Sequence, residues 1–139
     1  MASESLHPAS APSRRTVVAA VGAAGLAITL NACGSDDEGS TAAAGTVLGK
    51  TADIPEGGGK IFADAGVVVT QPTAGTYKAF SSKCTHQGCA VTGIADGVIT
   101  CPCHKSEFSV TDGSVKKGPA TQPLPEEKIT VSGDSITLA

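Results

Sequence analysis

Two short runs of cysteine and histidine constrain this 139-residue chain more than any other feature. The first run begins Cys84-Thr85-His86 and the second begins Cys101-Pro102-Cys103-His104, with fourteen residues between His86 and Cys101. Each run therefore offers one thiolate and one imidazole at close spacing, and both are common metal ligands. If one centre uses both pairs, the fold must bring the two runs to one place.

A structural zinc site is one interpretation of two cysteines and two histidines. Zinc sites usually pair like ligands, as C-x2-4-C and H-x3-5-H, whereas each run here is mixed. Zinc also leaves Cys89 and Cys103, the second cysteine of each run, without a role. The pattern therefore disfavours zinc, which remains the alternative to an iron–sulfur centre.

The two runs resemble the motifs of the Rieske [2Fe–2S] family, in which two histidines replace two cysteines on one iron. The resemblance includes the glycine after the first pair, the proline inside the second and the extra cysteine in each run. It extends from about Thr46 to the C-terminus. It implies a Rieske-type [2Fe–2S] cluster as the cofactor, with the ligands Cys84, His86, Cys101 and His104.

In the family members that this chain resembles, the two extra cysteines pair, which here implies a Cys89–Cys103 disulfide. Three further positions match residues near the cluster. Ser106 matches a serine that, in the family, donates a hydrogen bond to a bridging sulfide. Phe108 occupies the position of a tyrosine whose hydroxyl donates to the first cysteine ligand. Pro119 lies in Gly118-Pro119-Ala120, which resembles the family's proline loop over the cluster. A loop serine, a core phenylalanine and a plain turn remain the simpler interpretations.

The N-terminal residues 1–32 read as a signal peptide. A polar segment ends in Arg14-Arg15 and is followed by the uncharged run 16–30, which is shorter than the roughly 20 residues of a transmembrane helix. The paired arginines favour the twin-arginine export route, with an ordinary secretory signal as the alternative. Leu30-Asn31-Ala32-Cys33 resembles a bacterial lipobox, which implies lipidation of Cys33. Cleavage elsewhere would leave Cys33 as a stray thiol.

The mature chain is expected to divide into a flexible tether, residues 33–45, and a domain that resembles the Rieske family, residues 46–139. The tether is rich in Gly, Ala, Ser and Asp and has a reach of roughly 20 Å. From Cys33 onward, eight lysines face twelve acidic residues, a formal charge of −4. Such a chain has no basic stripe, so nucleic acid is not an expected partner.

The folded part is predicted to be all-β, because short β-branched runs alternate with turn residues and no stretch has sustained helical periodicity. This spacing favours a small antiparallel sandwich or barrel. The resemblance implies the Rieske build, with a cluster-binding subdomain inserted in a base sheet. The expected strands are 46–48, 60–62, 67–70, 76–80, 90–92, 98–100, 108–110, 128–131 and 135–138.

These features predict an extracytoplasmic one-electron carrier, lipid-anchored to the cell membrane, that serves an unidentified redox protein. It is not expected to be an enzyme with a small-molecule substrate of its own. The alternative is the Rieske subunit of a quinol–cytochrome c oxidoreductase. In those subunits a leucine and a glycine follow the two histidines, where this chain has Gln87 and Lys105. An oxygenase-linked Rieske ferredoxin is a third class, disfavoured by the extra cysteine pair.

The lipobox predicts that Cys33→Ala blocks processing or releases the mature protein from membranes, because two acyl chains are needed for a stable anchor. Cell fractionation and the mass of the N-terminal peptide measure both effects. Replacing Arg14 and Arg15 by lysine should stop export if the route is twin-arginine. Full-length protein with an intact N-terminus in the cytosol would contradict the localisation.

Overall fold

The structure, a computed structural model, describes residues 42–139. The expected signal peptide, Cys33 and most of the expected tether lie outside the described residues. Residues 42–139 form eleven β-strands and two single turns of 3-10 helix, η1 (Thr51–Asp53) and η2 (Ala63–Ala65). None of the helical turns in this part is long or apolar enough to cross a membrane. The predicted all-β class is confirmed.

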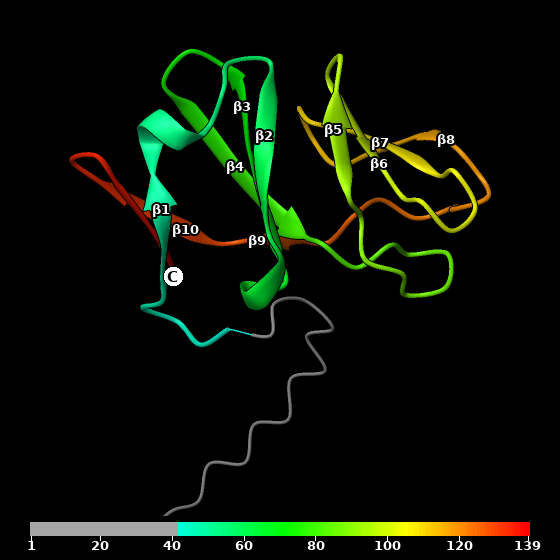
Figure 1. The fold of residues 1–139 in the computed structure, drawn as a ribbon, viewed down its shortest axis with the longest axis horizontal. Coiled ribbons are helices and arrows are strands. Elements are labelled where there is room, and N and C mark those ends of the chain that lie inside the picture. The colour runs from blue at the N-terminus through cyan, green and yellow to red at the C-terminus, as the bar shows by residue number, and fades with distance from the viewer. Residues whose placement is uncertain (1–41) are drawn as a thin grey trace, which may run out of the picture. The chain divides into compact units, whose positions relative to one another are not determined.

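The strands form three antiparallel sheets (Figure 1). The first sheet has the order β1 (Val47–Lys50), β11 (Ser135–Leu138), β10 (Ile129–Ser132). The second has the order β2 (Gly58–Phe62), β3 (Val67–Thr73), β4 (Thr76–Ser81), β9 (Glu126–Glu127). The third has the order β5 (Gly93–Ala95), β6 (Val98–Thr100), β7 (Glu107–Ser109), β8 (Val115–Lys117). Because the third sheet lies between β4 and β9 in the chain, it is a subdomain inserted into a base of two sheets.

The second sheet is covered on both faces, because the side chains of β3 point alternately to one face and the other. Successive residues of a strand point to opposite faces. Val67 and Val69 belong to the core shared with the first sheet, whereas Val68 belongs to the core shared with the inserted subdomain. All three valines are fully buried. The continuous apolar run 67–69 therefore marks a central strand between two cores.

Buried hydrogen bonds fix the inserted subdomain on the central sheet. The Thr70 hydroxyl on β3 donates to the Val110 carbonyl at 2.8 Å, and this bond joins residues forty positions apart. The Leu124 amide donates to the Gly113 carbonyl at 3.0 Å, and the Ser81 amide donates to the Pro125 carbonyl at 2.8 Å. The subdomain is thus positioned by backbone and hydroxyl groups as well as by apolar packing.

The structure differs from the sequence prediction in three places. The expected strand 90–92 is wrong, because the Val91 amide donates to the Ser82 carbonyl in a loop and the strand begins at Gly93. Strands β8 and β9 were not expected, since lysine and glutamate have low β propensity. Residues 42–45, assigned to the tether, are attached to the domain, with the Gly45 amide donating to the Leu138 carbonyl at 2.7 Å.

We expect Gly113→Ala to destabilise the protein much more than Gly75→Ala. Both glycines have positive φ, +70° and +77°, which costs an L-residue about 1 kcal/mol. A Cβ on Gly113 would lie 2.8 Å from the Phe80 ring, whereas one on Gly75 meets nothing within 4 Å. Overpacking adds about 1–3 kcal/mol. Thermal unfolding should show a shift of about 4–8 °C for Gly75→Ala and at least double that for Gly113→Ala; equal shifts would contradict the packing argument.

Candidate metal centre

The two Cys/His runs fold into loops with the same backbone pattern. In the first Cys/His loop, residues 84–89, the Cys84 amide donates to the Cys89 carbonyl at 2.7 Å and the Gly88 amide donates to the Cys84 carbonyl at 2.8 Å. In the second Cys/His loop, residues 101–106, the Cys101 amide donates to the Ser106 carbonyl at 2.9 Å, and the Lys105 amide donates to the Cys101 carbonyl at 3.1 Å. Each loop is closed by its first cysteine.

Equivalent positions in the two loops have a left-handed backbone. Gly88 has φ +76° and Lys105 has φ +62°. Glycine adopts this conformation without steric cost, whereas a residue with a Cβ loses roughly 1–2 kcal/mol. The second loop therefore carries a strained lysine where the first carries a glycine.

The predicted thiolates lie together beneath the surface. Cys84 and Cys101 are each 2 % exposed, and both are free cysteines. Burial raises the pKa of the Cys101 thiol, and the neighbouring Cys84 raises it further, while the backbone amides of Cys103 and His104 oppose this by donating to its sulfur. Those amides favour the thiolate form, which is the form that binds metals.

The predicted imidazoles lie nearer the surface. The ring centroids of His86 and His104 are 4.8 Å apart, with the rings edge to face. His104 is exposed and His86 is partly buried. The Nδ1 atom of His86 is buried and has no hydrogen-bond partner among the described residues. A buried nitrogen of this kind requires a partner, and a metal ion satisfies it.

The remaining cysteines join the two loops. Cys89 and Cys103 form a disulfide with a Cα–Cα distance of 6.5 Å, which is the pairing that the resemblance implies. The Sγ atoms of Cys89, Cys101 and Cys103 lie within 4.8 Å of one another. The disulfide is therefore adjacent to one of the buried thiols.

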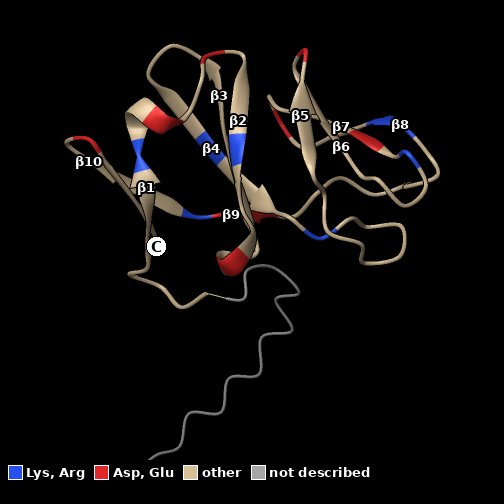
Figure 2. Cartoon of the chain, viewed as in Figure 1, with Lys and Arg blue, Asp and Glu red and all other residues tan. Residues whose placement is uncertain are grey.

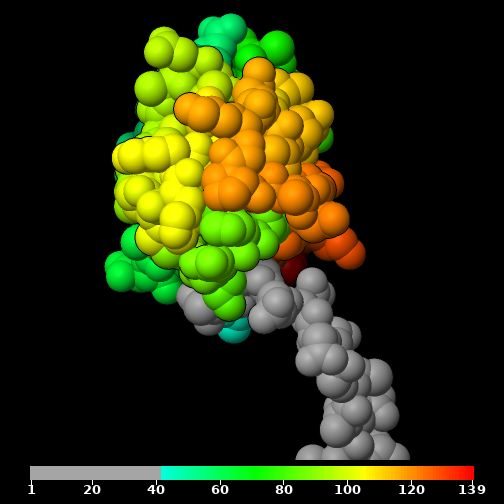
Figure 3. Space-filling view, turned by 90° about the vertical axis from the view of Figure 1, so that its right-hand side faces the viewer, coloured from blue at the N-terminus to red at the C-terminus, as the bar shows by residue number. Residues whose placement is uncertain are grey.

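A third loop, residues 118–125, is attached to both Cys/His loops, and we call it the proline loop. It begins at the cis Gly118–Pro119 bond, and Pro119 itself is exposed. The fully buried Ser106 hydroxyl accepts a hydrogen bond from the Ala120 amide at 3.0 Å. The Thr85 hydroxyl donates to the Gln122 carbonyl at 2.7 Å. Figure 3 shows the three loops in green, yellow and orange on one face of the protein.

Sequence reasoning missed the contact between Thr85 and Gln122, because the two residues are thirty-seven positions apart and no spacing rule connects them. Ser106 belongs to the second loop, and sequence reasoning did not anticipate its bond to the proline loop. That bond occupies the serine oxygen as an acceptor and leaves its proton to donate elsewhere. Phe108 is fully buried in the core cluster that also contains Cys84 and Cys101.

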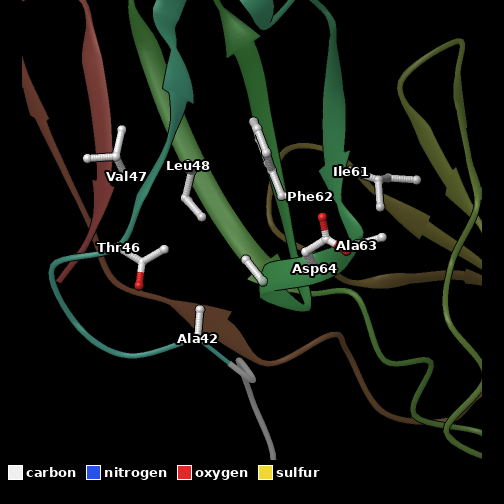
Figure 4. A pocket seen from close by; sticks show the side chains of 9 residues that line it. Ala42, Thr46, Val47, Leu48, Ile61, Phe62, Ala63 and Asp64 are labelled. Atoms are coloured by element: carbon white, nitrogen blue, oxygen red, sulfur yellow. The ribbon is translucent and has the colours of Figure 1, made fainter.

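Of two hollows in the protein surface, one lies beside the predicted ligands and the other lies away from them. One, of about 350 Å³, lies beside the first Cys/His loop and is lined by residues 83–88, which include the predicted ligands Cys84 and His86, and by Pro125. A larger one, of about 500 Å³, lies on the base between β1 and the β2–η2 segment and is mainly apolar (Figure 4). None of the four predicted ligands lines the larger hollow.

The donor set fits a mixed thiolate and imidazole centre. Two buried thiols lie on one side and two imidazoles lie toward the surface, on loops held by a disulfide and by hydrogen bonds to a third loop. Two thiolates and two imidazoles match the ligand requirement of a His-ligated [2Fe–2S] cluster. Two thiolates and two imidazoles are also zinc ligands, and the relatives of this chain distinguish an iron–sulfur cluster from zinc.

Comparison with known proteins gives iron–sulfur relatives. A putative Rieske subunit of respiratory nitrate reductase from Haloferax mediterranei is 42% identical over 73 residues, which cover 52% of this chain and 33% of that protein. The cytochrome b6-f complex iron–sulfur subunit of Chlorobaculum thiosulfatiphilum is 38% identical over 96 residues, covering 66% of this chain and 51% of that protein. The chain thus spans between a third and about half of the length of these curated relatives.

Solved structures of a Rieske protein and of a ferredoxin share the fold of this chain. The plasma membrane Rieske protein PetC3 from Synechocystis PCC 6803 is 35% identical with a TM-score of 0.56, and the match covers 68% of this chain and 98% of that one. The ferredoxin of carbazole 1,9a-dioxygenase from Nocardioides aromaticivorans IC177, at 22% identity and a TM-score of 0.55, shares the fold. The sequence profile of the Rieske [2Fe-2S] domain matches residues 45–128. The chain therefore belongs to the Rieske family of iron–sulfur electron carriers, whose domain binds a [2Fe–2S] cluster.

Proposed function

We propose that this protein is a membrane-tethered, extracytoplasmic one-electron carrier that acts as the redox partner or small subunit of a separate oxidoreductase. Cys84, His86, Cys101 and His104 hold the cluster. The proposal includes export by the twin-arginine route and a lipid anchor at Cys33. When bound, the cluster supplies a one-electron couple whose potential depends on hydrogen bonds and solvent exposure.

The contrast between buried thiols and an exposed imidazole carries this proposal. Cys84 and Cys101 are 2 % exposed, whereas His104 lies at the surface. Electrons can therefore pass through the edge of a ligand ring to a partner that docks on this face. Such an arrangement suits exchange between proteins.

The residues around the ligands hold the three loops in place. The Cys89–Cys103 disulfide connects the two Cys/His loops, and the proline loop is bonded to Ser106 in one loop and to Thr85 in the other. Ligands held in this way need little rearrangement when the charge of the centre changes. The buried surroundings of Cys84 and Cys101 also exclude water from the thiolate side.

A second candidate is a subunit of a quinol–cytochrome c oxidoreductase. The relatives named as cytochrome b6-f and bc1 iron–sulfur subunits favour it. The residues after the two histidines, Gln87 and Lys105, are both exposed and polar, and they favour an aqueous partner surface over an apolar quinol pocket. Purification from solubilised membranes distinguishes the candidates, since a tightly bound cytochrome b would support the second.

The ligand set predicts two irons and two sulfides per chain and the low average g-value of a His-ligated cluster on reduction. Iron analysis and electron paramagnetic resonance measure both. His86→Ala and His104→Ala should each lose the cluster or change its spectrum, whereas the neighbouring Gln87→Ala should retain both. Stoichiometric zinc without iron would overturn the assignment.

Ser106 and Phe108 are expected to adjust the reduction potential in opposite directions. Ser106→Ala should lower it, because it removes a donor that stabilises the reduced cluster, and Phe108→Tyr should raise it by adding one. A hydrogen bond to a charged group contributes about 1.5–3 kcal/mol, and about 1.4 kcal/mol corresponds to 59 mV. Only the difference between oxidised and reduced states counts, so redox titration should show shifts of tens of millivolts, at most about 100 mV.

Ser109→Ala is the matched control. The Ser109 hydroxyl is also buried and also accepts a backbone amide bond, from Thr111 at 3.1 Å, but it lies outside the Cys/His loops. Ser106→Ala should lose about 1–3 kcal/mol of stability, because it leaves the buried Ala120 amide unpaired, and Ser109→Ala should lose less, because Thr111 is exposed and its amide can bond to water. Only Ser106→Ala should move the potential. An unchanged potential in both Ser106→Ala and Phe108→Tyr would contradict the roles given to these residues.

A further inference from the structure

The end of the protein that carries the two Cys/His loops contains lysines and no acidic residue. We define this Cys/His end as residues 83–89, 101–106 and 116–125, which hold four lysines and no Asp or Glu. The carboxylates of the inserted subdomain lie on strand β7 and in the two hairpin turns at 95–98 and 110–114 (Figure 2). The rest of the mature chain carries the acidic excess, since the whole has a formal charge of −4.

Three of these four lysines form no ion pair among the described residues: Lys116, whose charge acts on Asp112, and the two lysines beside the Cys/His runs. Among the described residues, Lys50, Lys60, Lys78 and Lys117 form ion pairs, the last with Glu107 at 3.5 Å. Lys83 and Lys105 form none within residues 42–139, and both are exposed. Lys83 immediately precedes the first Cys/His loop, and Lys105 follows His104. Each loop thus has one uncompensated cation beside its imidazole.

The backbone at Lys105 indicates that its side chain serves something outside the fold. Its φ of +62° is strained for a lysine, and the equivalent residue of the first loop is a glycine with φ +76°. Because the side chain is exposed and makes no ion pair in the described part of the chain, packing does not account for a lysine here. Strained residues of this kind concentrate at functional sites.

A concave surface lies beside the other lysine. The hollow of about 350 Å³ at the first loop is lined by residues 83–88, which include the proposed ligands Cys84 and His86, and by Pro125. Its lining holds one ammonium group and no carboxylate. The charge of this lining is complementary to a carboxylate-bearing side chain of a docked protein.

We propose that the Cys/His end docks a redox protein with an acidic contact surface, and that Lys83 and Lys105 orient it against the exposed imidazole edge. This inference rests on the proposed carrier function and adds the chemistry of its partner. One electron passes from the reduced cluster to the oxidised centre of the partner, and no bond is made or broken. Local charge decides the encounter despite the negative total, because salt screens charges beyond about 8–10 Å.

The test uses the mature holoprotein and two c-type cytochromes of similar potential, one acidic and one basic, as electron acceptors. Stopped-flow oxidation of the reduced cluster is measured from about 100 mM to 1 M salt, a range over which the screening length falls from about 10 Å to about 3 Å. We expect the rate with the acidic cytochrome to fall as salt rises. A rate with the acidic cytochrome that rises with salt, as the total charge alone predicts, would overturn the proposal.

Charge reversals locate the docking surface. Lys83→Glu and Lys105→Glu should each lower the low-salt rate with the acidic cytochrome about 3–10-fold, within the range of electrostatic steering. Lys128→Glu is the matched control, since Lys128 is an exposed lysine of the base without an ion pair in the described residues. It makes the same change in total charge and should alter the rate less than twofold. An equal effect of all three variants would refute a local surface. The potential of each variant is measured to correct for driving force.

Lys105→Gly separates docking from folding. It relieves the positive φ, so we expect the melting temperature to rise by a few degrees while the rate with the acidic cytochrome falls. A lower melting temperature would show that the lysine side chain supports the fold, against the proposal. Oxidation of the cluster by neither cytochrome would overturn the carrier function itself, whereas oxidation by both with a preference for the basic one would overturn the docking surface alone.

Discussion

Burial of strand β3 on both faces is the constraint on which the rest of the structure depends. Val67 and Val69 enter one core and Val68 enters the other, and each is fully buried. Burying a valine contributes about 1.5–3 kcal/mol relative to leaving it exposed. Because apolar side chains stand on both faces of this strand, the first sheet covers one face and the inserted subdomain covers the other. The subdomain is thereby held against a rigid base.

The Cys/His loops depend on that base for their position and on one another for their shape. Their backbones repeat the same pattern of hydrogen bonds, and the disulfide joins them directly. The proline loop completes the arrangement, because it is bonded to Thr85 in one loop and to Ser106 in the other. These contacts hold the Cys84/His86 pair and the Cys101/His104 pair on two neighbouring loops, although fourteen residues separate the pairs in the sequence.

The placement of the donors separates two tasks. The buried thiols lie where water is excluded and where backbone amides favour the thiolate form, whereas His104 reaches the surface. An electron carrier needs both a protected centre and an accessible edge. Lys83 and Lys105, which form no ion pair within residues 42–139, place positive charge at that edge although the chain as a whole is negative.

The sequence by itself determined the type of cofactor, because two mixed Cys/His pairs with fixed spacing are local features that can be recognised without the fold. It also determined the all-β class, since strand periodicity is local. It misplaced the strand at 90–92 and missed β8 and β9, whose lysine and glutamate residues become strand only by pairing with β7 and β4. Only the tertiary structure decided that Thr85 bonds to Gln122 and that Lys105 has a left-handed backbone. The first depends on two loops meeting in space, which leaves no trace in the spacing of residues. The second depends on the hydrogen bonds that close the second Cys/His loop, which hold a lysine in a conformation that glycine prefers.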